Sequence, residues 1–439
     1  MARKHSVAAV CLLASLAFSV SAQDSGQTNT GESALFRGEQ LLMTGSYAAA
    51  TDIFQMADGL DRNEGLVGAS KAFAMMGNYI DAMSVVESAI DDDEYARFPL
   101  LSTQLAEVKR AVGESKEALE ILESVVAGLA EPPVRTLVQY GSLLDFVGQK
   151  QIAFSILDQA VQRYNNGLVF ASEDVAMVAL ASWLMGNFHD ANSLFNEATR
   201  ANPNNLEAHS LWGDLFLEKY NASDAERSYQ EAIDINGRYV PALVGMANVV
   251  GDERALQRAL AINPNSIPAM ETYGQLLMVN GREEEAQDYF DRVLALNPES
   301  LKTLSVLASQ AALEERSADY QGYLAQVESF SPNNPIFLGN VADSFGNNYL
   351  FDEAVEFARA AIAADPQYWQ GYTVLGSNLI RLGEEEEGKT NLEIGYENDP
   401  FNVMTSNMLK VFDTLETYAT LESEHFKVHM SENDADVLW

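Results

Sequence analysis

Histidine is the residue type in this 439-residue chain whose spacing most directly suggests chemistry. His425 and His429 stand four residues apart, the separation at which two histidines on one helix can share a zinc ion. The stretch 424–430, however, alternates polar and apolar residues, which is typical of a strand. A strand rises about 3.3 Å per residue, so the two side chains would lie roughly 13 Å apart. We therefore expect no metal site there.

Catalytic motifs are also missing from the sequence. It contains no H-E-x-x-H, no G-x-S-x-G and no phosphate-binding glycine loop. His189 follows a glycine turn and His209 occupies a helix-packing position, which favours structural roles for both. The acidic runs 283–285 and 384–387 open helices, where carboxylates stabilise the positive end of the helix dipole. The sequence predicts neither an enzyme nor a cofactor.

Regularly spaced prolines indicate which elements position these side chains. The prolines stand 34 residues apart, at Pro264, Pro298, Pro332, Pro366 and Pro400. Within each unit small residues recur where two helices would cross, as with Gly274 and Ala286 in unit 267–300. A 34-residue period is typical of a helix-turn-helix repeat that stacks on its neighbours. One unit, 240–266, has only 27 residues, and we expect both of its helices to be short.

The repeated positions resemble the tetratricopeptide repeat family. Looser units continue toward the N-terminus, each marked by a turn glycine followed five residues later by alanine: Gly45, Gly77, Gly113 and Gly148. The resemblance implies an all-α, right-handed superhelical solenoid of about eleven repeats across residues 34–402. It also implies a scaffold that binds another protein or a peptide along its concave surface.

The same resemblance implies which residues line the groove, because in this family the first helix of each repeat faces it. The predicted groove residues are Asp145, Glu173, Trp183, Glu207, Ser210, Asp214, Glu271, Gln275, Asp343, Gln370 and Ser377. This lining is acidic to neutral and lacks the lysine and asparagine cluster that clamps a carboxylate in some members. Trp183 either anchors an apolar residue of a partner or packs against the adjacent helix.

The first 22 residues read as a secretory signal peptide. Arg3 and Lys4 precede an apolar stretch, residues 7–20, and small residues end it at Ala22. That stretch is shorter than the roughly 20 apolar residues of a membrane span. Residues 23–33 are polar and predict a disordered linker. We expect a periplasmic or extracellular protein, and one without cysteine once Cys11 has been removed with the signal.

Charge restricts the choice of partner. The formal net charge is −37, with 27 basic against 64 acidic side chains. Such a surface repels phosphate groups, which excludes nucleic acid and anionic membranes as natural partners. A basic protein partner fits this charge. Solubility of an extended secreted array, or a saline habitat, explains this charge more simply.

The chain changes character after Pro400. Residues 403–417 predict a capping helix and residues 418–439 a β-prone tail. The phrase from Asn402 through Phe412-Asp413 to residues 422–428 resembles the junction at which exported repeat proteins continue into a peptidase-MA-like (gluzincin) metallopeptidase domain. The resemblance implies an alternative function, the repeat region of a zinc metallopeptidase whose catalytic domain lies outside this chain. A structural envelope spacer is the other alternative.

Overall fold

The computed structural model describes residues 30–90, 94–415 and 417–431. Within them lie 23 α-helices and two strands, and the predicted all-α solenoid is confirmed. Eleven helix pairs form the repeats, and α23 follows as an unpaired first helix. The first helices are α1 (Thr30–Met43), α3 (Arg62–Met75), α5 (Pro99–Ala111), α7 (Val134–Phe146), α9 (Ser172–Leu184), α11 (Leu206–Glu218), α13 (Val240–Val250), α15 (Ile267–Val279), α17 (Leu301–Leu313), α19 (Pro335–Asn347), α21 (Trp369–Leu382) and α23 (Val403–Leu415). The second helices are α2 (Tyr47–Phe54), α4 (Tyr79–Glu87), α6 (Ser115–Gly128), α8 (Lys150–Asn165), α10 (Phe188–Ala201), α12 (Ala222–Ile235), α14 (Glu253–Ile262), α16 (Glu283–Leu296), α18 (Ser317–Phe330), α20 (Phe351–Ala364) and α22 (Glu385–Asn398). Two 3₁₀ turns, η1 (Gly59–Asp61) and η2 (Tyr95–Arg97), lie in the loops between early repeats.

Two boundaries differ from the sequence prediction. Helix α1 begins at Thr30, inside the segment 23–33 that was predicted to be a disordered linker. A turn of polar residues can extend an already nucleated helix at little cost. The polar composition of residues 30–33 therefore did not show that they belong to α1. Helix α23 ends at Leu415, two residues before the predicted end of the capping helix.

Each repeat turns between its two helices through one residue with positive φ. These residues are Gly45, Gly77, Gly113, Gly148, Gly186, Tyr220, Gly251, Gly281, Glu315, Tyr349 and Gly383. In most of these turns, the N–H of the residue that follows the positive-φ residue donates to a carbonyl near the end of the first helix. Asn78 N–H, for example, donates to the Phe73 carbonyl at 3.0 Å. Glycine predominates because this backbone conformation is strained for residues with a Cβ.

Small residues let the helices cross closely. Ala50, Ala82, Ala286 and Ala354 are fully buried, as their repeat positions predict. The Tyr229 ring fills the space beside Gly213 and Gly245, where an added Cβ would lie only 2.5 and 2.2 Å from it. The short repeat is confirmed in both helices, since α13 has 11 residues and α14 has 10.

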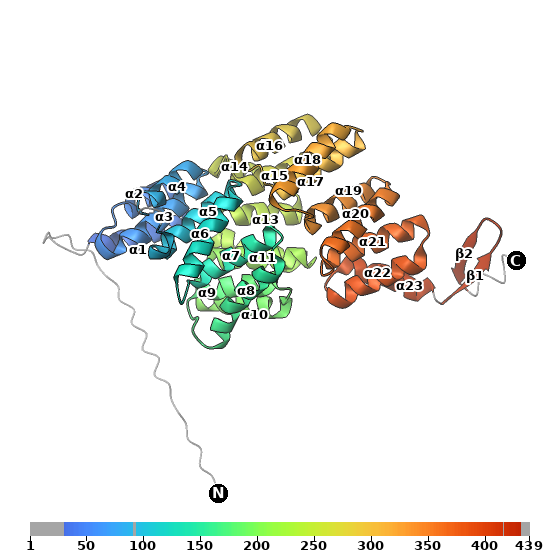
Figure 1. Ribbon diagram of the computed structural model, residues 1–439, viewed down its shortest axis with the longest axis horizontal. Coiled ribbons are helices and arrows are strands. Elements are labelled where there is room, and N and C mark those ends of the chain that lie inside the picture. Colours follow the sequence, from blue (N-terminus) through green and yellow to red (C-terminus); the bar gives the residue numbers. More distant parts are fainter. Residues whose placement is uncertain (1–29, 91–93, 416, 432–439) are drawn as a thin grey trace, which may run out of the picture.

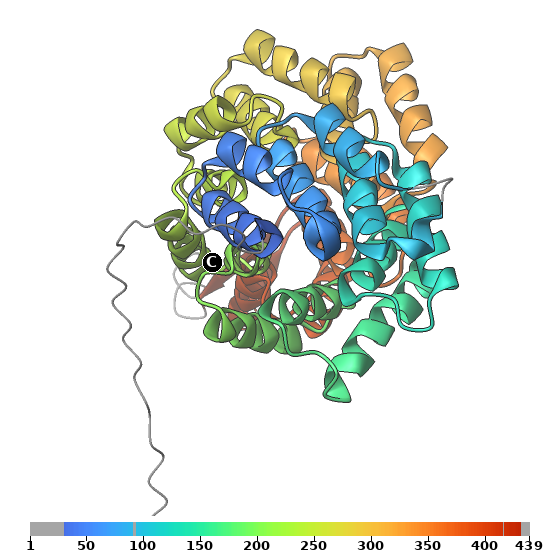
Figure 2. The same cartoon turned by 90° about the vertical axis from the view of Figure 1, so that its left-hand side faces the viewer.

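The array coils so that its second superhelical turn, α13 to α23, lies against its first, α1 to α12 (Figure 1). In the end view the helices form a ring (Figure 2). The contacts join segments about 190 residues apart. Asn236 Nδ2 donates to the Leu42 carbonyl at 3.4 Å, and Asn263 Nδ2 donates to the Ala74 carbonyl at 3.2 Å. These carbonyls lie in the last turn of a first helix, where they also accept from the turn glycines, Gly45 N–H at 3.1 Å and Gly77 N–H at 3.0 Å.

The same contact recurs further along. Asn297 Nδ2 donates to the Ala111 carbonyl at 3.2 Å, and Ser331 Oγ donates to the Phe146 carbonyl at 2.5 Å. The last two contacts are ionic: Lys150 with Asp365 at 2.5 Å and Lys219 with Asp399 at 3.2 Å. We call these six contacts the inter-turn ladder. The asparagine and serine donors and the two aspartates of this ladder all occupy one repeat position. It is the residue before Gly237 or before one of the periodic prolines.

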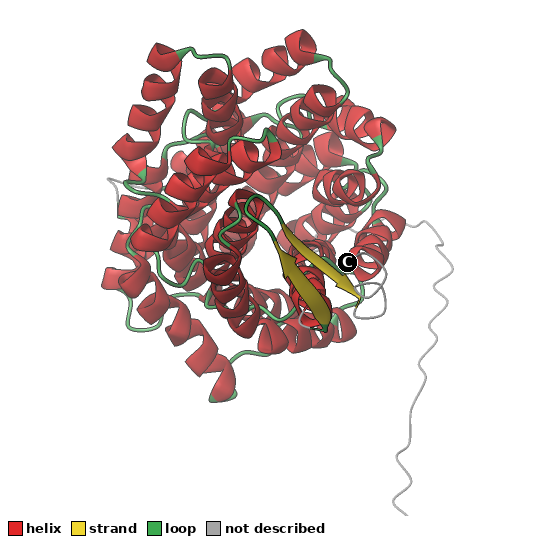
Figure 3. Cartoon of the chain, turned by 90° about the vertical axis from the view of Figure 1, so that its right-hand side faces the viewer, coloured by secondary structure: helices red, strands yellow, loops and turns green. Residues whose placement is uncertain are grey.

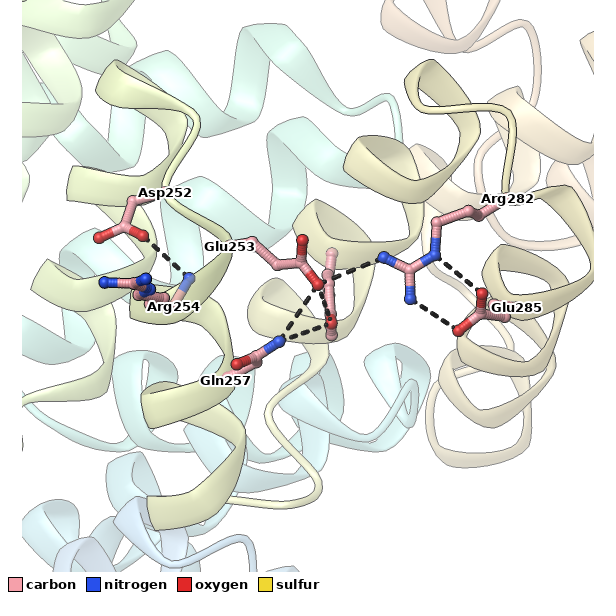
Figure 4. Close-up of polar contacts among 7 residues, drawn as sticks. Asp252, Glu253, Arg254, Gln257, Arg282 and Glu285 are labelled. Atoms are coloured by element: carbon pink, nitrogen blue, oxygen red, sulfur yellow. Dashed lines mark hydrogen bonds and ion pairs between the residues drawn. The ribbon is translucent and has the colours of Figure 1, made fainter.

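A β-hairpin follows α23, as the β-prone tail predicts. Strands β1 (Tyr418–Glu422) and β2 (Lys427–Ser431) pair antiparallel, with Thr420 opposite His429 (Figure 3). His425 lies in the connecting turn and not on the same strand as His429, so the expectation of one strand across both histidines was wrong. The Ser423–Phe426 backbone hydrogen bond, 2.8 Å long, closes that turn.

Candidate protein-interaction face

The first helices share one surface, the side toward which the array curves. Arg135 on α7 shows that this inner face is tightly curved, because it contacts both the preceding first helix α5 and the first helix two repeats ahead, α11. Second helices contribute no residue to this contact. The predicted groove residues all lie on first helices, as the repeat register requires.

A bridge of three charges crosses the inner face of the first superhelical turn. The Arg135 guanidinium binds Glu107 at 2.6 and 3.1 Å and Glu207 at 2.8 and 3.0 Å, so both pairs are two-pronged. The three side chains are only 25%, 17% and 35% exposed. Burial alone would raise the pKa of Glu207, but the Arg135 charge and hydrogen bonds outweigh burial and hold that pKa below its ordinary value. Lys71 faces the same group, and burial lowers its pKa.

Several predicted groove residues are engaged within the fold. Glu207 is held by Arg135, and Asp214 accepts a 2.6 Å hydrogen bond from the Tyr229 hydroxyl. Glu271 accepts from Ser300 at 2.5 Å. Ser210 and Ser377 are buried, and the Ser377 hydroxyl donates to the Thr373 carbonyl of its own helix at 2.5 Å. Contact of these five with a partner stays a prediction.

Trp183 packs within the fold, and its contact with a partner stays a prediction. Its indole packs at the margin of the core cluster formed by α7 to α11, and its Nε1 donates to Glu218 at 2.9 Å. The side chain is half-buried, so part of the ring stays accessible.

The remaining predicted residues keep polar groups at the surface. Gln275 on α15 is half-buried, and Asp343 on α19 and Gln370 on α21 are exposed, all in the second superhelical turn. Glu173 is exposed and accepts a weak 3.3 Å hydrogen bond from Asn202. Asp145 is half-buried, and its pKa is raised by burial and by Asp365 of the other superhelical turn.

Sequence reasoning missed Glu107 and Lys71 as members of the inner face. Both stand where Asp214 stands in its own repeat, 11 residues before the buried helix-crossing alanine, here Ala118 and Ala82. Extending that count into the looser N-terminal repeats would have found them.

The burial of the Asp214 carboxyl on the inner face should make the stability of the fold depend on pH. Burial raises the pKa of Asp214 to about 6, although the Tyr229 hydrogen bond opposes the rise. Because the folded pKa lies above the ordinary value of 3.8, folding loses stability as pH rises through about 4 to 6. Asp214→Asn, which keeps an acceptor for Tyr229, should stabilise the fold by about 1–2 kcal/mol at pH 7 and by almost nothing at pH 4. Urea unfolding at both pH values measures this, and an equal effect at both would contradict it.

Two segments of the array match family models. Residues 179–239 and 267–300 each match a model described as tetratricopeptide repeat. Tetratricopeptide repeats are thus found in these two segments of the chain. Over 72 residues it is 32% identical to small glutamine-rich tetratricopeptide repeat-containing protein 2 of Mycosarcoma maydis, a match that covers 16% of this chain and 20% of that protein. The chain thus spans about a fifth of the length of this curated relative.

A crystal structure of yeast Tom70 is also similar, at 15% identity and a TM-score of 0.35, over 88% of this chain and 97% of that one. Among residues 30–90, 94–415 and 417–431, no group of three or more histidine, aspartate or glutamate side chains is placed to hold a metal ion. The tetratricopeptide repeats in segments 179–239 and 267–300 point to protein interaction.

Proposed function

We propose that this protein is an exported scaffold that binds another protein, or a peptide segment, along the inner face of its tetratricopeptide array. One observation carries the proposal: first helices from α1 to α23 present one continuous face, and its second superhelical turn keeps polar side chains available. We assign partner contact to Gln275, Asp343 and Gln370, of which Gln275 is half-buried and the other two are exposed.

The chemistry of these residues suggests the kind of partner. Glutamine side chains both donate and accept hydrogen bonds, as the backbone of an extended peptide does. Asp343 and the net charge of −37 favour basic side chains on the partner. A basic, extended segment is therefore the ligand that fits this face best.

Export rests on the sequence pattern of residues 1–22, which lie outside the described residues. No helix in the described part of the chain is long and apolar enough to cross a membrane. N-terminal sequencing of the protein recovered from its native host should begin at Gln23. Recovery of a chain that still carries residues 1–22 would contradict export by cleavage.

Site-specific photocrosslinking in cells tests the binding face. A photoreactive residue at Gln275 or Gln370 should capture the same partner, whereas one at Glu284, exposed on the second helix α16, should not. Asp343→Lys should weaken capture, more strongly at low salt because screening is weaker there. Equal capture from Glu284 would move the site to the outer surface, and no capture from any position would favour the envelope spacer.

The hairpin favours a second candidate, the repeat region of a longer metallopeptidase. Among the described residues, its two strands pair with each other alone. Val428 on β2 and Phe426 in the connecting turn are exposed. An in-frame H-E-x-x-H encoded downstream of Trp439 would support this candidate, and its absence would remove it.

A further inference from the structure

Each superhelical turn has two edges, and the inter-turn ladder covers only one edge of each. We call the side where the two helices of a repeat connect the turn edge, and the side where one repeat connects to the next the loop edge. In the ladder, the turn edge of the first superhelical turn meets the loop edge of the second. The loop edge of the first superhelical turn and the turn edge of the second therefore remain uncovered, at opposite ends of the molecule.

The turn glycines show which part of the turn edge is covered. A Cβ at Gly77 would lie 2.3 Å from the Asn263 side chain, and a Cβ at Gly113 would lie 2.5 Å from Asn297. At Gly251, Gly281 and Gly383, in the second superhelical turn, nothing lies within 4 Å. Gly186 is the turn glycine of the first superhelical turn that is likewise open.

Apolar side chains are exposed along the uncovered part of the turn edge. They lie at the ends of first helices or in the turns themselves, at Val250, Val279, Leu313, Tyr349 and Leu382. Val279 is 85% exposed and Tyr349 is 82% exposed. Residues at the ends of α3 and α7, Met75 and Phe146, are half-buried by contrast, because this part of the edge lies under the second superhelical turn.

The uncovered loop edge carries a matching set. Met56 and Leu60 in the first loop, and Leu168 and Phe170 in the fourth, are exposed, with Leu60 at 100% and Phe170 at 80%. The loop at Asn202 has the local shape of the loops that already dock. Asn202 Oδ1 accepts from the backbone of the residue two positions on at 3.1 Å, as Asn263 Oδ1 does at 3.0 Å.

We propose that copies of this chain assemble head to tail, with the turn edge of one copy's second superhelical turn docked on the loop edge of the next copy's first superhelical turn. The contact repeats, between molecules, the same pairing of edges that the ladder makes within one molecule. Because it joins two different surfaces, it does not close on itself and extends into a chain of copies.

The ladder also gives the register. The turns at Gly45, Gly77 and Gly113 dock on the loops at Asn236, Asn263 and Asn297, each five repeats ahead. The Lys150–Asp365 contact spans six repeats, and the register proposed here follows the five-repeat spacing of the first three turns. Since α23 takes the place of a twelfth first helix, the next copy begins at the thirteenth position. Its first loop then falls on the turn of the eighth repeat, which brings Val279 to Met56 and Leu60. By the same count Leu382 meets Leu168 and Phe170.

Charge and shape set conditions on this assembly. A net charge of −37 on each copy opposes association, so added salt should promote it by screening that repulsion. In Figure 3 the hairpin lies over the centre of the ring and leaves most of the rim in view.

Sedimentation of the protein at increasing concentration and salt tests the assembly. The average mass should rise for the unchanged protein and for Ile80→Glu, a control on α4 that is 79% exposed in the first superhelical turn. Val279→Glu and Leu60→Glu should remain monomeric, and both positions are exposed enough for the fold to tolerate the change. A monomer under all conditions, or an equal loss in the Ile80 variant, would overturn the proposal.

Cysteine crosslinking tests the register independently. In a Cys11→Ser background, a mixture of Val279→Cys and Leu60→Cys chains should form a disulfide-linked dimer on mild oxidation. Val279→Cys mixed with Leu168→Cys, three repeats out of register, should not, because a disulfide needs Cα atoms within about 7 Å. Equal yields in the two mixtures would mean random collision and would overturn the proposed contact.

Discussion

Gly77→Ala is expected to lower the free energy of unfolding by about 3 kcal/mol, and Gly281→Ala by only about 1 kcal/mol. Both glycines have positive φ, 78° and 70°, so alanine suffers the same backbone strain at either turn. At Gly77 the added methyl must also displace Asn263, which lies 2.3 Å from the ideal Cβ position. The difference between the two variants therefore isolates the contact between superhelical turns.

Urea unfolding of the two variants, followed by circular dichroism, measures this difference. Asn263→Ala in the Gly77→Ala background should recover part of the loss, since it removes the side chain that the methyl displaces. Equal losses at Gly77 and Gly281 would show that the first superhelical turn does not rest on the second in solution.

Arg135→Met is expected to lower the free energy of unfolding by about 2 kcal/mol at pH 7. Removing one member of an enclosed charge group leaves the others uncompensated, at a cost of about 3–5 kcal/mol when burial is complete. We expect the smaller figure because Arg135 and Glu207 are 25% and 35% exposed. Glu207 has a lowered pKa in the folded state, so its stabilising effect is present above its unfolded pKa and is lost as pH falls through the folded value.

The Arg135 variant should therefore lose less stability than the unchanged protein when pH falls below about 4.5. Adding Glu107→Gln and Glu207→Gln to Arg135→Met should restore most of the stability at pH 7, because no uncompensated charge remains. Thermal unfolding at pH 4 and 7 distinguishes these cases. If the triple variant were no more stable than Arg135→Met, lost packing and not charge would explain the effect.

The repeat register was readable from the sequence because it depends on neighbours. The periodic prolines, the turn glycines and the buried alanines such as Ala286 all act within one helix pair or between adjacent pairs. Even the shortened repeat was readable, since its missing residues come from α13 and α14 themselves. The same count placed the predicted groove residues on first helices, where all of them lie.

Partners within the fold were not readable in the same way. Asp214 and Glu271 have the residue types of a ligand-binding groove, yet they accept hydrogen bonds from Tyr229 and Ser300. Whether a carboxylate faces solvent or a neighbouring hydroxyl depends on the angle between packed helices, and the residue count does not determine that angle.

The sequence by itself determined the helix pairs, their order and the face that each presents, because these follow from local periodicity and from contacts between adjacent repeats. Only the tertiary structure decided how tightly the array coils. Small rotations from one repeat to the next add up over about five repeats, and their sum brings Asn263 to the end of α3 and Arg135 between Glu107 and Glu207. A sum of small angles leaves no pattern in the sequence, and so the contact between superhelical turns, with the two edges it leaves uncovered, appears only in three dimensions.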